Sequence, residues 1–139
     1  MTGQIQSWAR EMLERPGVFA TLATVMADGT PHQAVIWYLV RDEVIVVNSA
    51  VGRIWPSNLL RDPRYSLVIE DGYDWVGVRG RAEAITDQPT AQADIAEMAR
   101  RYHAGDPDKA EAMIRGTFMP QERISFLLHP ERVIEHPDA

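Results

Sequence analysis

The chain has 139 residues but no cysteine, so it can form neither disulfides nor thiolate ligands. Its first residues, MTGQIQSWAREMLERPG, carry acids and no apolar run, unlike a signal peptide or a membrane span. No basic cluster is longer than the pair Arg100 and Arg101, and the formal net charge is −6. These features predict a cytoplasmic protein and argue against binding to nucleic acid or to a membrane.

Motifs of several enzyme classes are also missing. The sequence has no nucleophile elbow, Walker loop or HExxH motif, and the GVRG segment at residues 77–80 is not a dinucleotide fingerprint. The four histidines, at positions 32, 103, 129 and 136, lack the spacing typical of metal ligands. The sequence therefore predicts no metal site and identifies no catalytic set of its own.

The apolar periodicity predicts a single domain over residues 1–139, mainly β with flanking helices. Its expected parts are an N-terminal helix at about 4–14, a barrel at about 18–86 and 121–135, and a helical insertion at about 89–116. The six predicted strands are 18–26, 31–40, 44–48, 64–70, 73–86 and 123–128, the last extending past a proline bend toward residue 134. Such a meander favours a small barrel, because closure removes exposed strand edges.

Two glycines interrupt the strand predicted at residues 73–86. Gly77 and Gly80 lie on opposite faces of this segment, because successive side chains of a strand alternate. Glycine weakens a strand and usually marks a bend, a bulge or the close approach of another group. The two positions therefore suit a sheet that must curve.

A short helix is predicted at residues 54–61, between two polar signals. Asn48 and Ser49 precede it with side-chain oxygens that suit an N-cap, and Pro56 falls in its first turn. Pro63 ends the helix, because proline lacks an amide hydrogen and restricts the residue before it. The helix therefore has one or two turns and an open N-terminus.

Arg53 lies at the start of this helix, with Ser57 and Asn58 close behind. The unpaired amide groups of a helix N-terminus and a nearby guanidinium both favour an anion, so the segment is a candidate anion site. Alternatively, Arg53 and Arg61 are surface charges on a connecting segment. The residues alone leave both interpretations open.

The order of these parts is similar to a known family. The FATLATVMADGTPHQAVIWY opening, the GRIWPSNLLRDPRYSLVI centre, the WVGVRGRAEAI strand and the helix ending in ARRY resemble the flavin-binding split-barrel superfamily named after pyridoxamine 5′-phosphate oxidase. Within it, they most resemble the branch that depends on the deazaflavin F420. The resemblance covers residues 18–135, and its most specific piece is the NL-x-RDPR-x-SL pattern at residues 58–67.

This resemblance implies a six-stranded antiparallel split β-barrel of the FMN-binding type. It also implies a homodimer with two cofactor grooves at the subunit interface. The phosphate-binding turn of the family falls on residues 52–58, so Arg53 is expected to contact the cofactor phosphate. Relatives often carry a lysine where this chain has Trp55, and a further basic residue near Ser57. The cofactor-binding candidates are Gln33, Val35, Trp37, Asn48, Ser49, Arg53, Ile54, Trp55, Pro56, Ser57, Asn58, Trp75 and Arg79.

Several of these candidates have a second interpretation. Trp37 suits contact with the cofactor ring, but it equally suits packing in the core or at the dimer interface. Trp75 and Arg79 are placed by the resemblance near the groove of the partner subunit, and an exposed strand face explains them as well. His32 and Tyr38 are the only candidates for a proton donor, beside solvent.

The function that the resemblance implies is an F420-dependent oxidoreductase. Such an enzyme transfers a hydride between the deazaflavin and a small organic acceptor, and the cofactor supplies the chemistry, which agrees with the missing catalytic motifs. Two alternatives stay open. One is an FMN-dependent oxidase or reductase on the same barrel, and the other is a protein that binds a flavin, deazaflavin, haem-like or tetrapyrrole ligand without turnover.

Overall fold

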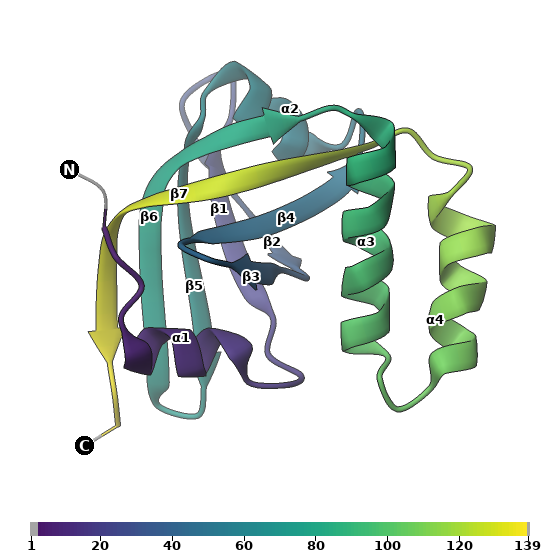
Figure 1. Cartoon of the computed structure of the whole chain (residues 1–139). Helices are drawn as coiled ribbons and strands as arrows, with labels where there is room; N and C mark the ends of the chain where they lie inside the picture. Colours follow the sequence, from purple (N-terminus) through teal and green to yellow (C-terminus); the bar gives the residue numbers. More distant parts are fainter. Residues whose placement is uncertain (1–2, 139) are drawn as a thin grey trace.

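The computed structural model describes residues 3–138 as one curled sheet flanked by helices (Figure 1). The helices are α1 (Ser7–Glu14), α2 (Ile54–Arg61), α3 (Gln88–Tyr102) and α4 (Pro107–Met113), followed directly by the π-helical turn η1 (Ile114–Phe118). The strands are β1 (Ala20–Val25), β2 (Pro31–Ile36), β3 (Leu39–Arg41), β4 (Val44–Ala50), β5 (Arg64–Asp71), β6 (Asp74–Ile85) and β7 (Arg123–His136). The chain is therefore mainly β with flanking helices, as the sequence predicts.

All strand pairs are antiparallel, and the order across the sheet is β2-β1-β5-β6-β7-β4-β3. The two edge strands, β2 and β3, are consecutive in the chain and separated only by residues 37–38. The sheet must therefore curl until its two edges come close to each other. The result is a half-barrel consistent with a split barrel (Figure 1).

The described residues form seven strands, so the prediction of six is wrong. The single strand predicted at residues 31–40 is divided at Trp37 and Tyr38, where the chain leaves β1 and begins to pair with β4. The two side chains pack in different places. Tyr38 is fully buried and its hydroxyl donates a hydrogen bond to the Leu13 carbonyl at 2.7 Å, whereas the Trp37 ring stacks on Tyr102 of α3. Because Tyr38 and Trp37 pack in different places, the chain crosses between them from one edge of the sheet to the other. No local sequence signal indicates this break in the strand.

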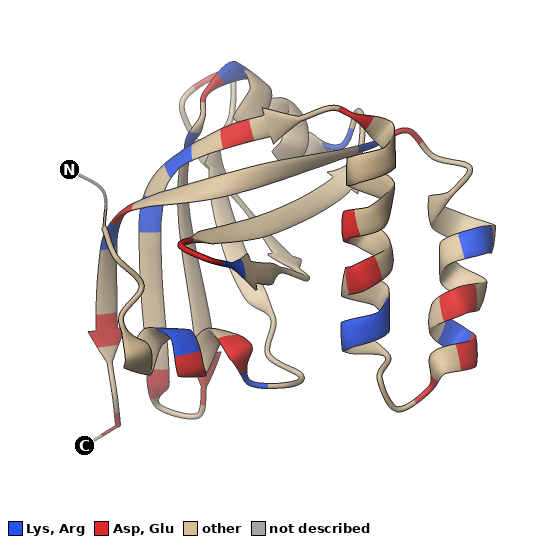
Figure 2. Ribbon diagram, in the orientation of Figure 1, with Lys and Arg blue, Asp and Glu red and all other residues tan. Residues whose placement is uncertain are grey.

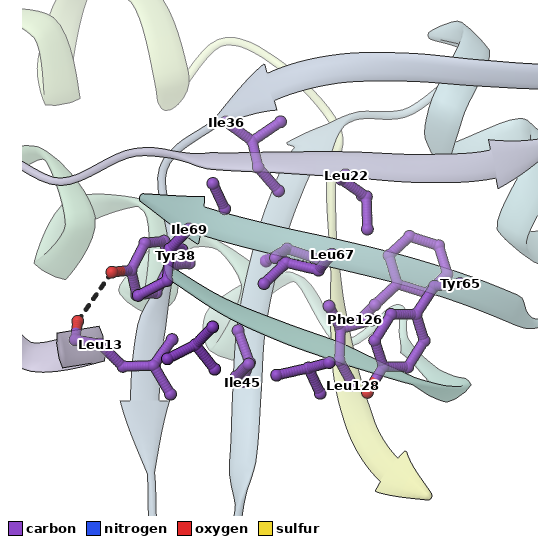
Figure 3. Packing of buried hydrophobic residues seen from close by; sticks show 14 of the residues in the cluster. Leu13, Leu22, Ile36, Tyr38, Ile45, Tyr65, Leu67, Ile69, Phe126 and Leu128 are labelled. Carbon is purple, nitrogen blue, oxygen red and sulfur yellow. Dashed lines mark hydrogen bonds between the residues drawn. The ribbon is translucent and has the colours of Figure 1, made fainter. Parts of the chain in front are cut away.

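Two apolar cores stabilise the fold. The larger core fills the concave side of the sheet beneath α1, and Figure 3 shows part of it around Leu67 and Phe126. The smaller core lies between the helical insertion and the strands β3 and β4, where Met98 of α3 packs near Val46. The helical insertion is thus fixed to one end of the sheet, beside α2 and the end of β4 (Figure 1).

Strand β6 bends at a bulge. The pairing of β6 with β7 shifts register between Arg79 and Gly80, which leaves Glu131 of β7 unpaired. A Cβ atom on Gly80 would lie 2.0 Å from the carbonyl oxygen of His129, so only glycine fits there. The expectation of a bulge or a close approach is confirmed at this position.

Candidate functional site

A pocket of about 370 Å³ lies where the helical insertion meets the curled sheet. Its walls come from β2, the end of β4, the start of α2, the helices α3, α4 and η1, and the start of β7. The lining residues are Phe19, Val35, Ile36, Trp37, Asn48, Ser49, Arg53, Trp55, Ile95, Met113, Phe118 and Arg123. The lining thus combines two arginines, two neutral polar side chains and a majority of apolar and aromatic groups, with no acid.

The pocket contrasts with the rest of the molecule in charge. The chain has a formal net charge of −6, and its acidic residues are spread over helices and strands (Figure 2). None of them belongs to the lining. A cationic pocket in an acidic protein is the arrangement expected for an anionic ligand, since the surrounding charges do not neutralise the site.

The structure brings several sequence-predicted candidates into this pocket. They are Val35, Trp37, Asn48, Ser49, Arg53 and Trp55. Trp55 is nonetheless buried, and its ring lies 5.9 Å from that of Phe126 in the larger core. Trp37 also has a packing role, because its ring stacks on Tyr102 at 5.2 Å and meets Phe118 edge-on at 6.3 Å. It therefore offers a fixed aromatic wall to the pocket.

Other residues of the predicted phosphate turn lie outside the lining. Ile54 is exposed at the start of α2, and within this helix Ser57 is half-buried and Pro56 is buried. The Asn58 amide donates to the Thr24 hydroxyl at 3.0 Å, which ties α2 to β1. Asn58 therefore has a structural contact that requires no ligand.

The remaining candidates lie on the convex side of the sheet or in the core. Register places Gln33 and Arg79 in one row across the convex side, and Trp75 stacks on His136 with ring centroids 5.0 Å apart. His32 is half-buried on the edge strand β2 and does not line the pocket. The Tyr38 hydroxyl faces the core and α1 rather than the pocket, and burial raises its pKa well above the ordinary value.

The N-cap of α2 is not formed by the residues that the sequence predicts. Asn48 and Ser49 belong to β4 and do not cap the helix, because Arg53 occupies the N-cap position without a capping side-chain hydrogen bond. The amide groups of the first turn are therefore without a side-chain acceptor. A positive side chain at the positive end of a helix is unfavourable, and a bound anion would reverse that effect.

Arg123 is the residue that the sequence interpretation missed. It is 4% exposed, and its guanidinium lies 4.9 Å from the centre of the Phe118 ring. Nε donates to Oδ1 of Asn48 at 3.0 Å and Nη1 donates to Oε1 of Gln121, both neutral acceptors. Burial, and then the nearby charge of Arg53, lower the pKa of Arg123 from its ordinary value to about 10. Arg123 is therefore a buried, charged group without an acidic partner among residues 3–138.

No local signal identifies Arg123. It stands at the start of the apolar strand RISFLL, where a charged residue is normally read as a solvent-exposed end. The lining residues Phe19, Ile95, Met113 and Phe118 were missed for a related reason. Ile95, Met113 and Phe118 lie between α3 and the end of η1, and the position of this helical segment over the pocket depends on the smaller core rather than on nearby sequence.

A sequence profile described as pyridoxamine 5′-phosphate oxidase matches residues 6–135. The chain belongs to this family. The resemblance found from the sequence motifs is thus confirmed, and the half-barrel described above fits a pyridoxamine 5′-phosphate oxidase-like fold. A search of curated proteins found no match.

Solved structures with this family fold differ in what they bind. An F420 reductase is 26% identical, with a TM-score of 0.71 over 90% of this chain and 94% of the other. A conserved hypothetical protein from Mycobacterium tuberculosis is 24% identical, with a TM-score of 0.75 over 100% of this chain and 94% of the other. The haem storage protein HutZ from Vibrio cholerae is 20% identical, with a TM-score of 0.70 over 95% and 94%. At these two lower identities the likeness shows the fold alone.

Membrane-spanning helices and metal-ligand clusters are both missing from the described part of the chain. Within residues 3–138, every helix is too short or too polar to cross a bilayer. Over the same residues, His, Asp and Glu side chains form no group of three or more that is placed to hold a metal ion.

Proposed function

We propose that the pocket binds the deazaflavin F420 and that the protein is an F420-dependent oxidoreductase acting on a small organic acceptor. The observation that supports this proposal is that aromatic side chains and two arginines line the same pocket, and that no acidic residue lines it. A planar ring system with a phosphorylated tail combines the two chemistries that these walls recognise. The cofactor, when bound, supplies hydride transfer, and the protein supplies binding and orientation.

Each part of the pocket has a role in this proposal. Arg53 and the open N-terminus of α2 bind the phosphate, because both offer donors and positive potential. Trp37 and Phe118 form an apolar wall for the ring, and Trp55 packs beneath the tail in place of the lysine of many relatives. The apolar lining excludes water from the bound ring, which favours hydride transfer over side reactions.

The choice of F420 over FMN depends on the F420 reductase, which is 26% identical over nearly the whole chain. FMN carries a phosphate on the same kind of tail and is the alternative cofactor. Haem fits less well, because the described lining contains no histidine to serve as an axial ligand. A carrier of flavin or deazaflavin differs from both enzymes in that it binds the cofactor without turnover.

We also propose that the protein forms a homodimer through the convex side of the sheet, which completes the pocket. We call this surface the outer face, and its central row is Val35, Thr21, Val68, Gly77 and Ile134. Val35 is 71% exposed, and it belongs both to this row and to the pocket lining. A second copy on the outer face therefore covers the open side of the pocket, and Gln33 and Arg79 of the adjacent row would lie near the interface.

Parallel titrations with F420 and with FMN test the cofactor assignment. Tryptophan fluorescence reports binding, because Trp37 and Trp55 line the pocket. Tighter binding of F420 supports the reductase, and tighter binding of FMN assigns the protein to the FMN branch. Reduced F420 that binds but is not oxidised when varied acceptors are added would indicate a carrier.

The first prediction concerns Arg53. Arg53→Ala should weaken cofactor binding by about 1.5 to 3 kcal/mol, the usual worth of a charge-assisted hydrogen bond to phosphate. The control is Arg64→Ala, because Arg64 is exposed, pairs with Asp62 at 2.6 Å and lies outside the lining. Equal affinity of Arg53→Ala and the wild type would contradict the phosphate assignment.

A further inference from the structure

A buried chain of hydrogen bonds leads from the protein surface to the pocket. Ser125 Oγ donates to Oδ2 of Asp94 at 2.6 Å, and Asn48 Nδ2 donates to Ser125 Oγ at 2.9 Å. Arg123 Nε then donates to Oδ1 of Asn48 at 3.0 Å. All four residues are buried, and they come from α3, β7 and β4.

The direction of each bond in this chain is determined. Asp94 accepts the only hydroxyl proton of Ser125, so the Ser125 oxygen presents its lone pairs to Asn48. The Asn48 amide nitrogen has two acceptors, Ser125 Oγ and the Ala91 carbonyl, both at 2.9 Å. Turning this amide over would place its NH₂ group against the N–H of Arg123. Asn48 must therefore present its oxygen to Arg123.

The negative charge in this chain of hydrogen bonds is that of Asp94, and it is balanced on the side away from the pocket. Asp94 pairs with Arg41 at 2.6 Å, and Arg41 also reaches the exposed Glu97 at 2.8 Å. Between Asp94 and Arg123 stand a neutral hydroxyl and a neutral amide. Arg123 is thus oriented by the chain without being neutralised by it.

A buried guanidinium held only by neutral groups is costly unless a counter-charge is near it. Nε and Nη1 of Arg123 have acceptors. Nη2 has no hydrogen-bond acceptor among residues 3–138 and is not one of the fully buried side-chain atoms, so it stays accessible to a ligand in the pocket. Arg53, whose charge lowers the pKa of Arg123, lines the same pocket. An anion bound between the two arginines would supply the missing counter-charge.

We infer that Asp94, Ser125 and Asn48 are positioning residues that hold Arg123 as a second phosphate-binding cation beside Arg53. This inference rests on the cofactor site proposed above and deepens it, because it assigns the cofactor phosphate to both arginines. It also explains why the loss of basic residues around Trp55 is tolerated. Arg123 contributes positive charge from the start of β7, which pairs with the end of β4 at Ala50.

Calorimetric titration of the whole protein with inorganic pyrophosphate tests the inference without a flavin. Arg123→Gln and Asn48→Ala should each lower pyrophosphate affinity about tenfold or more, since each removes or misaligns a charge-assisted contact. In the double variant, affinity should be no lower than in Arg123→Gln alone, because Asn48 acts through Arg123. Glu97→Gln, on the outer side of Arg41, is the control and should bind as the wild type does.

Circular dichroism checks that each variant folds. If Asn48→Ala does not fold, Ser125→Ala takes its place, because it removes one hydroxyl and leaves the bond from Asn48 to the Ala91 carbonyl. Three results would overturn the inference: wild-type protein that does not bind pyrophosphate, Arg123→Gln with unchanged affinity, or an Asn48 effect that is equally large without Arg123. Coupled pyrophosphate binding in a protein that binds neither F420 nor FMN would instead refute the proposed function and leave the anion site standing.

Discussion

Arg53 and Arg123 show how one pocket uses two arginines differently. Arg53 is exposed at the N-cap of α2, where its charge adds to that of the helix end. Arg123 is buried on the ring of Phe118, and its position depends on Asn48. Because both charges face the same space, each disfavours the other until an anion is bound.

The pKa of Arg123 gives a prediction for pH dependence. The pKa is lowered to about 10 by burial and by Arg53, and a bound anion favours the charged form and raises the pKa again. Compared with Arg123→Gln, wild-type pyrophosphate affinity should therefore fall as the pH rises through about 10. Arg53→Ala should move the fall to higher pH, because it removes the repulsion.

Calorimetric titration between pH 8 and pH 11 measures this profile. Pyrophosphate itself also titrates in this range, so Arg123→Gln, which keeps that contribution, is the necessary control. Its profile should lack the fall. The same fall in Arg123→Gln would show that another group is responsible.

At the scale of elements, two features shape the curled sheet. The crossing at Trp37 and Tyr38 carries the chain from one sheet edge to the other and places Trp37 against the helical insertion. The bulge at Gly80 bends β6 and β7, the longest strands. The crossing depends on side chains that contact segments distant in the sequence. The bulge depends on the lack of a side chain at Gly80, where the backbone of β7 comes close.

Two glycines of β6 provide a matched test of this bend. Gly80→Ala should lower the free energy of unfolding by about 3 kcal/mol, because its Cβ would lie 2.0 Å from the backbone oxygen of His129. Gly77→Ala should change it by less than about 1 kcal/mol, because its Cβ would lie 3.5 Å from the ring of Trp75, an ordinary contact. Urea unfolding compares the two at one protein concentration at which light scattering finds both variants monomeric, because Gly77 also lies in the outer face. Similar losses in both variants would refute the role assigned to the bulge.

At the scale of the whole molecule, the outer face and the pocket meet at Val35. The row from Val35 to Ile134 is built of small or apolar side chains, and Val68 stands at its centre. A surface of small and apolar residues allows two sheets to approach closely. The proposed dimer therefore both covers this surface and closes the pocket.

Light scattering tests this assembly. The wild type should have twice the 15.7 kDa mass of one chain, and Val68→Glu should have the mass of one chain, because a dimer would bury the new carboxylate unpaired. Tyr73→Glu is the control, since Tyr73 is 81% exposed in the turn between β5 and β6. A wild-type mass of 15.7 kDa at every concentration would refute the dimer.

Local sequence patterns were enough to predict the family, the mainly β architecture and the short helix that begins after Arg53. Each of these depends on nearby residues: turn signals between strands, proline at the ends of α2, and the contiguous pattern at residues 58–67. Such signals act within a few positions of the chain. They also identified Gly80 as a place of close approach, because glycine is otherwise unfavourable inside a strand.

The division of the predicted strand at residues 31–40, and the residues that complete the pocket, depend on tertiary contacts. The strand divides because Tyr38 reaches Leu13 and Trp37 reaches α3, and both partners are remote in sequence. The hydrogen bond between Asn48 and Arg123 joins residues 75 positions apart. Contacts of that separation depend on the packing of the whole sheet and its helices, so a local pattern cannot report them.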